Sequence, residues 1–400
     1  MLEAVLARRT PPRIAYAPNY WQWFAHHRNH GTLPPELAAC RSQLDLIRHL
    51  GLAVFSRNLY CDEQRGWWGG LAEPCLTNSC GRELPRASAC NAPSRPNPTA
   101  TSNLETITRE WHDGRDLVIE KTFHTRAGTL TERLRYVWAE STLVQEKYLV
   151  DDYDHQFDAL TDFVRARRWQ FLPERWATWS GQVGADGCVV AGELHSPLKM
   201  LHVLLGAQNA TYFLMDHPER AAELLALHEA AMLDLVEQLA TGGVRVLMCM
   251  DNLDAAFHPP HYIEKYSASF YAKAAQLCHA HGALLFIHAC GRQRDNLKLI
   301  AGLGVDGLEG VAFPPLGDVQ LDEALQLGGE KFIVTGGISA KEFERLQTRA
   351  EIFSYVRELC SRLRPYAHRF ILSASCNTPY TAPWERIVDF RDAWLECGAT

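Results

Sequence analysis

The feature that most constrains the fold is the alternation of short apolar runs with longer amphipathic segments, which begins near residue 180. Each apolar run has the length of a strand, and the segments that follow have the length and periodicity of helices. Repeated strand–helix units predict a parallel sheet covered by helices. Two earlier runs fit the same scheme. The expected strands are 14–17, 53–58, 189–192, 244–250, 283–288, 306–309, 331–335 and 369–373.

Eight strand–helix units in a chain of 400 residues favour a closed α/β barrel, the (β/α)8 TIM barrel, over an open doubly wound sheet. The strand count by itself is compatible with both. We therefore expect a single TIM-barrel domain over 1–400, with its chemistry at the carboxyl ends of the strands. The expected helices include 35–50, 218–240, 260–281, 296–303 and 383–395.

Residues 61–140 interrupt this pattern between the second and third strands. The first part, to about residue 104, is rich in Pro, Ser, Asn, Gly and Arg, which is typical of a loop. Strand-like runs at 104–111, 117–124 and 129–139 then follow, and the glycine-containing turns between them predict a β-meander. We interpret 61–140 as an insertion made of a flexible loop and this meander.

Composition excludes several functional classes. The 40 basic and 47 acidic residues give a net charge of −7, which offers no electrostatic footprint for nucleic acid or an anionic membrane. The N-terminus lacks the apolar region of a secretory signal, and no run approaches the ~18 apolar residues of a membrane span. We therefore expect a cytoplasmic protein whose 12 cysteines are reduced. For the loop cysteines a structural metal site and simple thiols both remain open. They are Cys61, Cys75, Cys80 and Cys90.

The sharpest motif is His288-Ala289-Cys290-Gly291, directly after the strand 283–288. Cys376 follows the last expected strand, and in a barrel both strand ends open onto the same rim. One imidazole and two thiolates form a three-ligand zinc site with an open fourth position, which is typical of catalytic zinc. The alternative is that these cysteines are packed, unreactive thiols.

Further motifs accompany this one: Gly336-Gly337-Ile338, the segment 375–380, Pro383-x-Glu385 and Thr125-x-x-Gly128-x-Leu130. Together with the HxCG motif they resemble the uroporphyrinogen decarboxylase superfamily, specifically its zinc-dependent, corrinoid-linked methyltransferase branch. The resemblance implies a (β/α)8 barrel and Zn²⁺ held by His288, Cys290 and Cys376. It also implies a corrinoid (cobalamin) cofactor. Since the chain contains no Asp-x-His-x-x-Gly motif, we expect a separate corrinoid protein to supply it.

The implied activity is transfer of a methyl group between a small methylated substrate and the cobalt of that corrinoid. The decarboxylases resemble one another in an arginine-rich N-terminal loop, whereas here 18–27 is aromatic and lacks arginine. We therefore favour O-demethylation of a methoxylated aromatic compound. A methylcobamide:thiol methyltransferase, a uroporphyrinogen decarboxylase-like decarboxylase and a non-catalytic binding protein remain alternatives. The sequence is compatible with a homodimer.

Polar and aromatic residues at the other expected strand ends are candidates for the remaining roles. A fourth metal ligand, a partner for His288 or a proton donor could come from Glu193, Asp251 or Asp254. Each could instead cap a loop or pair with an arginine. The candidates for substrate binding are Asn19, Trp21, Trp23, Asn252, Glu309 and Gly337. The aromatic residues among them would equally suit the core, and Gly337 could simply give the backbone room to turn.

Overall fold

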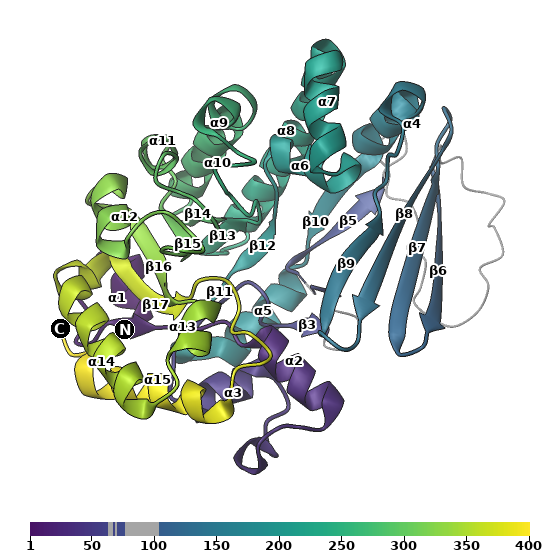
Figure 1. Cartoon of the computed structure of the whole chain (residues 1–400). Coiled ribbons are helices and arrows are strands. Elements are labelled where there is room, and N and C mark those ends of the chain that lie inside the picture. The colour runs from purple at the N-terminus through teal and green to yellow at the C-terminus, as the bar shows by residue number, and fades with distance from the viewer. Residues whose placement is uncertain (63–66, 69, 77–103) are drawn as a thin grey trace.

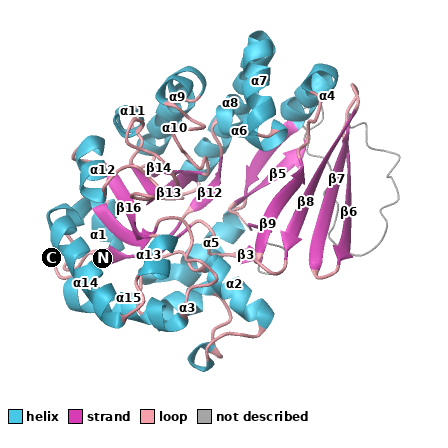
Figure 2. Cartoon of the chain, viewed as in Figure 1, coloured by secondary structure: helices cyan, strands magenta, loops and turns pink. Residues whose placement is uncertain are grey.

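The computed structural model describes residues 1–62, 67–68, 70–76 and 104–400 (Figure 1). It is an α/β fold with a curled parallel sheet, and helices lie around the outside of this sheet (Figure 2). The strands of the curled sheet are β1 (Ala15–Tyr16), β2 (Val54–Ser56), β11 (Gly187–Val189), β12 (Ala191–Leu194), β13 (Val246–Cys249), β14 (Leu284–His288), β15 (Gly307–Val311), β16 (Ile333–Ile338) and β17 (Phe370–Ala374).

The strands pair in the order β1-β17-β16-β15-β14-β13-β12, all parallel. β2 pairs in parallel with β11, which continues into β12 across Val190. The backbone amide of Ala53 donates to the carbonyl of Tyr16 at 3.0 Å, so β2 also lies beside β1. All eight predicted strands are therefore present in the sheet. The third is split into the two short pieces β11 and β12.

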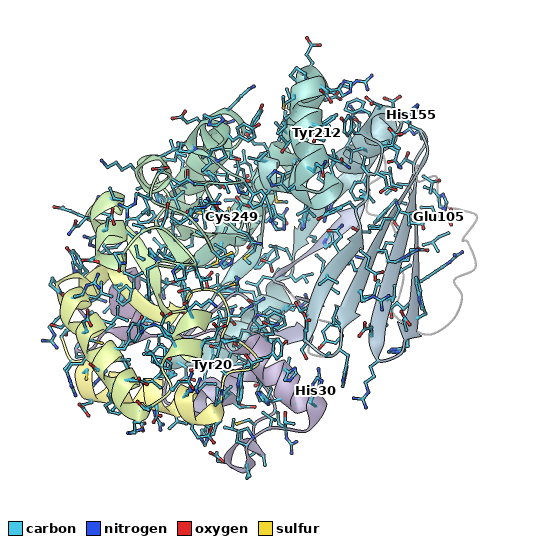
Figure 3. The ribbon with its side chains drawn as sticks, in the orientation of Figure 1. Tyr20, His30, Glu105, His155, Tyr212 and Cys249 are labelled. Atoms are coloured by element: carbon cyan, nitrogen blue, oxygen red, sulfur yellow. The ribbon has the colours of Figure 1, made fainter. Side chains whose placement is uncertain are left out.

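Both faces of the curled sheet are buried. On β13, Val246 and Met248 belong to an apolar cluster inside the curl, whereas Leu247 and Cys249 belong to the larger core beneath the helices. Figure 3 labels Cys249 in this part of the molecule. Since side chains alternate between the faces of a strand, burial on both sides produces the continuous apolar runs that are visible in the sequence.

Two predicted helices are interrupted in the structure. The segment 35–50 contains a 3-10 turn at Pro35–Leu37 and a helix that starts only at Gln43, where Ser42 and Asp45 form a capping box. The segment 260–281 is two helices that meet at Ser267. The α-helices are α1 (Leu2–Leu6), α2 (Trp21–His30), α3 (Gln43–His49), α4 (Tyr153–Ala166), α5 (Pro173–Val183), α6 (Pro197–Leu205), α7 (Ala207–Asp216), α8 (Pro218–Thr241), α9 (Pro260–Tyr266), α10 (Ala268–Ala280), α11 (Leu297–Gly302), α12 (Leu321–Gly328), α13 (Ala340–Arg345), α14 (Arg349–Leu363) and α15 (Trp384–Cys397).

Among the helices in the described ranges, none combines the length and the apolar character needed to cross a membrane.

The predicted meander is an antiparallel sheet of four strands rather than three, at the right of Figure 1. It comprises β6 (Glu105–Asp113), β7 (Asp116–His124), β8 (Thr129–Val137) and β9 (Thr142–Lys147). β9 extends beyond the expected boundary at residue 140. Its residues are half-buried or exposed, so its apolar alternation is too faint to indicate a strand.

The described residues between β2 and β6 form three further short strands, β3 (Cys61–Asp62), β4 (Trp67–Trp68) and β5 (Ala72–Leu76). β3 pairs with β4, and β5 pairs in antiparallel fashion with β10 (Arg167–Phe171). Cys80 and Cys90 lie outside the described residues, and only the backbone of Cys61 and Cys75 is described. Both alternatives for these cysteines, a structural metal site and simple thiols, therefore stay open.

Candidate metal centre

A polar layer of side chains lies directly beyond the apolar interior of the curled sheet. In the apolar interior, Phe55 on β2 and Phe286 on β14 meet edge to face, with ring centroids 5.4 Å apart. Because side chains alternate along a strand, Arg57 and His288, each two residues further on, face the same interior. The register of β14 and β15 places Glu309 beside His288. Buried charged groups of this kind require partners.

The three polar side chains supply those partners to one another. Arg57 Nη1 donates to Glu309 Oε1 at 2.7 Å, and both side chains are only 4% exposed. The other carboxylate oxygen, Oε2, bonds to His288 Nδ1. Since the carboxylate already faces a guanidinium, it is the acceptor and Nδ1 carries the proton. In the neutral imidazole this tautomer leaves the lone pair of Nε2 on the opposite side of the ring, where it can bind a metal.

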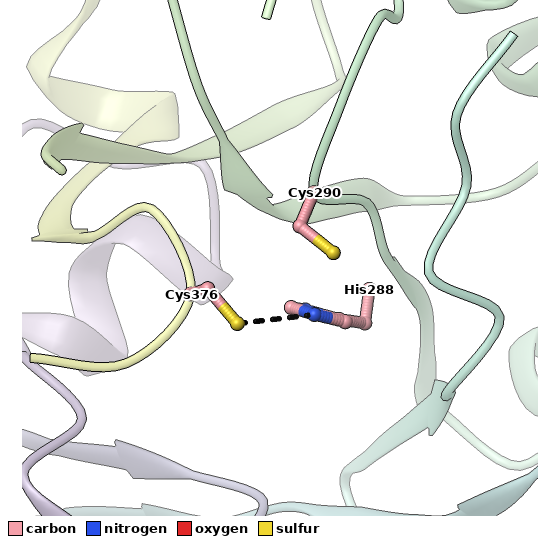
Figure 4. Close-up of side chains that lie close together, drawn as sticks. All are labelled: His288, Cys290 and Cys376. Carbon is pink, nitrogen blue, oxygen red and sulfur yellow. Dashed lines mark hydrogen bonds between the residues drawn. The ribbon is translucent and has the colours of Figure 1, made fainter. Parts of the chain in front are cut away.

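Two cysteines meet His288 on that free side of the ring (Figure 4). A ring nitrogen of His288 and the sulfurs of Cys290 and Cys376 all lie within 4.8 Å of one another. His288 Nε2 and Cys376 Sγ are 3.7 Å apart. Tetrahedral zinc places a nitrogen and a sulfur ligand about 3.6 Å apart. Within the described ranges this is the one group of three or more histidine, cysteine or acidic side chains with such spacing, and it fits zinc.

The protonation of the two thiols differs. A hydrogen bond from Cys290 lowers the pKa of Cys376 well below its usual value and outweighs the opposing effect of burial, with further help from His288 and Arg57. That same hydrogen bond, together with burial, raises the pKa of Cys290. Burial and Arg57 lower the pKa of His288, but Glu309 and Cys376 outweigh them and raise it overall. The lowered pKa of Cys376 favours its thiolate form, and binding of a metal would require Cys290 to lose its proton as well.

Two glycines allow these groups to approach one another. Gly310 on β15 has a φ of +92°, and a Cβ there would lie 2.7 Å from the carbonyl oxygen of Ser375 and 3.1 Å from Cε1 of His288. A Cβ on Gly291 would lie 2.3 Å from a carboxylate oxygen of Asp254. Because glycine has no Cβ, neighbouring loops can approach the His288 imidazole at Gly310 and the turn after Cys290 at Gly291.

The loop that carries Cys376 is fixed by its neighbour Asn377. The side-chain oxygen of Asn377 accepts hydrogen bonds from Asn19 Nδ2 and from Trp21 Nε1, both at 2.8 Å. Asn19 and Trp21, which the sequence suggested as substrate-binding residues, therefore connect the N-terminal segment to a metal-ligand loop.

Comparison with known proteins is consistent with this geometry. The family described as "Uroporphyrinogen decarboxylase (URO-D)" matches residues 161–396, which is more than half of the chain and includes all three clustered ligands. The chain belongs to the uroporphyrinogen decarboxylase family. A search of curated proteins finds no match.

Solved structures extend the likeness of this uroporphyrinogen decarboxylase family member to nearly its whole length. A methyltransferase from Methanosarcina mazei covers 99% of this chain and 97% of its own, with a TM-score of 0.53 and 13% sequence identity. A D-psicose 3-epimerase with D-tagatose from Clostridium cellulolyticum H10 covers 56% of this chain and 82% of its own, with a TM-score of 0.35 and 10% identity. At 13% sequence identity, the similarity to the methyltransferase shows a shared fold.

Two predicted catalytic acids in this family member differ in exposure, because Asp251 is buried and Glu193 is half-buried. Asp251 is fully buried and accepts hydrogen bonds from the backbone amide of Ser196, at 3.0 Å, and from the hydroxyl of Tyr271. Burial raises its pKa. Glu193 Oε1 accepts from the backbone amide of Leu71, and burial raises the pKa of Glu193 to about 7. Both groups therefore have surroundings that favour the protonated acid.

The remaining predicted residues have other contacts. Asp254 forms an ion pair with Arg292 at 3.2 Å. Asn252 is exposed and has a φ of +49°. Gly337 faces leucine side chains of the core, and Trp23 is fully buried and donates to the carbonyl of residue 382 at 2.8 Å. Three predicted site residues have the spacing of metal ligands, and a fourth, Glu309, bonds to one of them: the ligands are His288, Cys290 and Cys376.

Sequence reasoning missed Arg57, which pairs with Glu309 and lies with Nη2 3.9 Å from Cys376 Sγ. A signal was available, because Arg57 is two residues beyond Phe55 and so faces the same side of an apolar strand. A charged residue at such a position requires a buried partner, although the sequence does not reveal which acid supplies it.

Proposed function

We propose that this protein is a zinc-dependent methyltransferase on a closed (β/α)8 barrel, with 61–140 as an insertion in its single domain. It moves a methyl group between a small methylated substrate and the cobalt of a corrinoid carried by a partner protein. The proposal depends on the convergence of His288, Cys290 and Cys376 at one end of the sheet. The similar structure described as a methyltransferase, which covers almost the whole chain, supports it.

The favoured reaction is O-demethylation of a methoxylated aromatic compound. Zinc supplies Lewis acidity toward an ether oxygen, and the corrinoid supplies a nucleophilic cobalt for the methyl group. Trp21 donates to Asn377, the residue after Cys376, so an aromatic side chain is anchored to the loop that carries a metal ligand. The absence of arginine from 18–27 disfavours a polycarboxylate substrate.

The chain's own residues position the ligands and hold a proton. Glu309, anchored by Arg57, orients His288 so that Nε2 faces the two sulfurs. Burial raises the pKa of Glu193 to about 7, and its Oε2 is buried without a hydrogen-bond partner among the described residues. A carboxylic acid in this state suits proton donation to a leaving oxygen.

A second candidate is a methylcobamide:thiol methyltransferase. The two sulfur ligands favour it, because a thiolate-rich zinc site with an open position also binds and deprotonates a substrate thiol. The decarboxylase alternative requires no zinc, so metal content separates it from both methyltransferases.

The decisive experiment measures zinc per chain after purification with added zinc. We expect about one zinc per chain in the wild type and loss of zinc in Cys290→Ser. The control is Cys397→Ser, a half-buried cysteine on α15 outside the ligand cluster, which should keep its zinc. Demethylation of methoxyphenols by a cob(I)amide acceptor is then assayed. A folded wild type that binds no zinc would refute the methyltransferase proposal.

A further inference from the structure

The segment that leads into α2 holds the beginning of the loop after Cys376. The side chains of Asn19 and Trp21 both donate to the side-chain oxygen of Asn377, which is the next residue after this cysteine. The backbone amide of Thr378 donates in return to the carbonyl of Asn19 at 3.0 Å. These hydrogen bonds tie the first two residues of the loop to the start of α2.

The helix α2 itself holds the rest of this loop. Trp23 Nε1 donates to the carbonyl of Ala382 at 2.8 Å, and His27 Nε2 donates to the carbonyl of Tyr380 at 3.0 Å. A carbonyl oxygen only accepts hydrogen bonds, so Nε2 of His27 carries the proton. Burial lowers the pKa of His27 and favours the neutral ring, whose Nδ1 accepts from the hydroxyl of Thr32 at 2.7 Å. Contacts with α2 and its leading segment therefore extend over the loop from residue 377 to residue 382.

A column of four rings leads from this loop across α2 to the meander. Tyr380 packs against His26 with ring centroids 4.6 Å apart, and His26 stacks on His30 at 4.1 Å. His30, which Figure 3 labels, lies against Trp138 at 5.4 Å, in the turn between β8 and β9. His26 and His30 are one helical turn apart, so their rings lie on the same face of α2. Burial, with His30 and His27, lowers the pKa of His26 to about 4, so this ring is neutral in the stack.

Hydrogen bonds accompany the column on the side of the meander. Gln22 Nε2 donates to the carbonyl of Glu140 at 3.1 Å, in the same turn as Trp138. Asn29 Nδ2 lies 3.2 Å from the hydroxyl oxygen of Tyr136 on β8 and donates to it. Both ends of α2 are therefore attached to the meander, while the helix also holds the loop that carries a metal ligand.

We propose that α2 couples the meander to the metal centre, because it transmits the position of the meander to the loop that carries Cys376. His26, His27 and His30 are then positioning residues for this ligand, although none of them belongs to the ligand group. A zinc site requires its ligands to lie within about 0.2 Å of their ideal distances, so a small shift of the loop weakens metal binding. The part of the inference that concerns zinc rests on the proposed function, whereas the coupling between meander and loop does not.

The first test measures amide hydrogen exchange by mass spectrometry in the metal-free, full-length protein. His30→Leu and Trp138→Leu each remove one ring of the column, and we expect exchange over 376–382 to become about 2–30-fold faster. Exchange over 288–291, which carries the other two ligands, should stay as in the wild type. His30→Phe keeps a ring in the column and should retain slow exchange. The matched control is His155→Leu on α4, where the side chain is 85% exposed.

The second test measures zinc affinity by competition with a chromogenic chelator. His30→Leu and Trp138→Leu should weaken zinc binding about 2–30-fold. In a Cys376→Ser background the same substitutions should leave the remaining zinc affinity unchanged, because the ligand that α2 positions is absent. A general loss of stability would instead weaken binding equally in both backgrounds.

Thermal unfolding shows whether each variant is folded, and Trp138→Leu keeps the test independent of changes within α2. Wild-type exchange over 376–382 in both leucine variants, or an equal loss of zinc affinity with and without Cys376, would overturn the coupling. A loss in His30→Phe as large as in His30→Leu would overturn the role of the ring column. Failure of the proposed function looks different. The wild type would bind no zinc or support no corrinoid-dependent demethylation, while the leucine variants would still exchange faster over 376–382.

Discussion

Replacing Glu309 by Gln tests whether the buried carboxylate orients the zinc ligand. In the wild type one oxygen accepts from Arg57 and the other from His288 Nδ1. A glutamine has one acceptor and one donor end, so it cannot accept from both. If its NH2 group faces Arg57, two donors meet. If it faces His288, Nδ1 must accept, and the proton moves to Nε2, where it blocks the metal.

The expected losses of zinc affinity and of folding stability can both be estimated. Loss of a carboxylate that orients a metal-bound histidine typically weakens metal binding 10–100-fold, or about 1.4–2.7 kcal/mol. In addition, Arg57 is 4% exposed and loses its counter-ion. Breaking a buried ion pair from one side costs about 3–5 kcal/mol of folding stability. We therefore expect Glu309→Gln to lower both zinc affinity and the free energy of unfolding of the metal-free protein.

The assay combines competition for zinc with a chromogenic chelator and urea unfolding without metal. The double variant Glu309→Gln, Arg57→Met removes the unpaired charge, so it should regain stability without regaining zinc affinity. The control is Asp306→Asn at the opposite end of β15, where the carboxylate pairs with Arg8 at 2.6 Å. This variant should lose stability and keep its zinc affinity. Wild-type zinc affinity in Glu309→Gln would refute the reasoning.

Two further predictions concern neighbouring positions. Gly310→Ala should lower stability by about 1–3 kcal/mol through backbone strain and should also weaken zinc binding, because its Cβ would press on His288 and on the Ser375 carbonyl. Gly329→Ala, with a φ of +82° and open space around it, isolates the strain alone, and equal zinc affinities in the two variants would contradict the packing argument. Glu193 has its pKa raised by burial from 4.5 to about 7, so the folded state holds this proton more tightly than the unfolded state. Its contribution to stability is therefore complete below about pH 4.5 and declines by up to ~3 kcal/mol as the pH rises to about 7. Urea unfolding at several pH values should show that Glu193→Gln flattens this decline, and an unchanged slope would argue against a raised pKa of Glu193 in the folded state.

The local sequence was sufficient to predict features that depend on a single strand or a single turn. The apolar runs predicted all eight strands of the curled sheet, because burial on both faces leaves a continuous apolar signal. The local sequence was insufficient to predict features that depend on packing between elements. Strand β9, whose residues are half-buried or exposed, lacks that signal, and the break at Ser267 divides a segment whose helical pattern is otherwise continuous. Helix and strand ends depend on such contacts more than on periodicity.

The candidate metal centre was likewise predictable in part from the sequence and in part only from the structure. By itself the sequence determined that an imidazole and two thiols stand at strand ends, and parallel topology was enough to expect them at one rim. Only the tertiary structure decided that Glu309 orients His288 and that Arg57 anchors Glu309. These contacts join residues up to 252 positions apart in the chain. Strand register and burial select the partner of each charge, and neither is encoded in the spacing of residues along the chain.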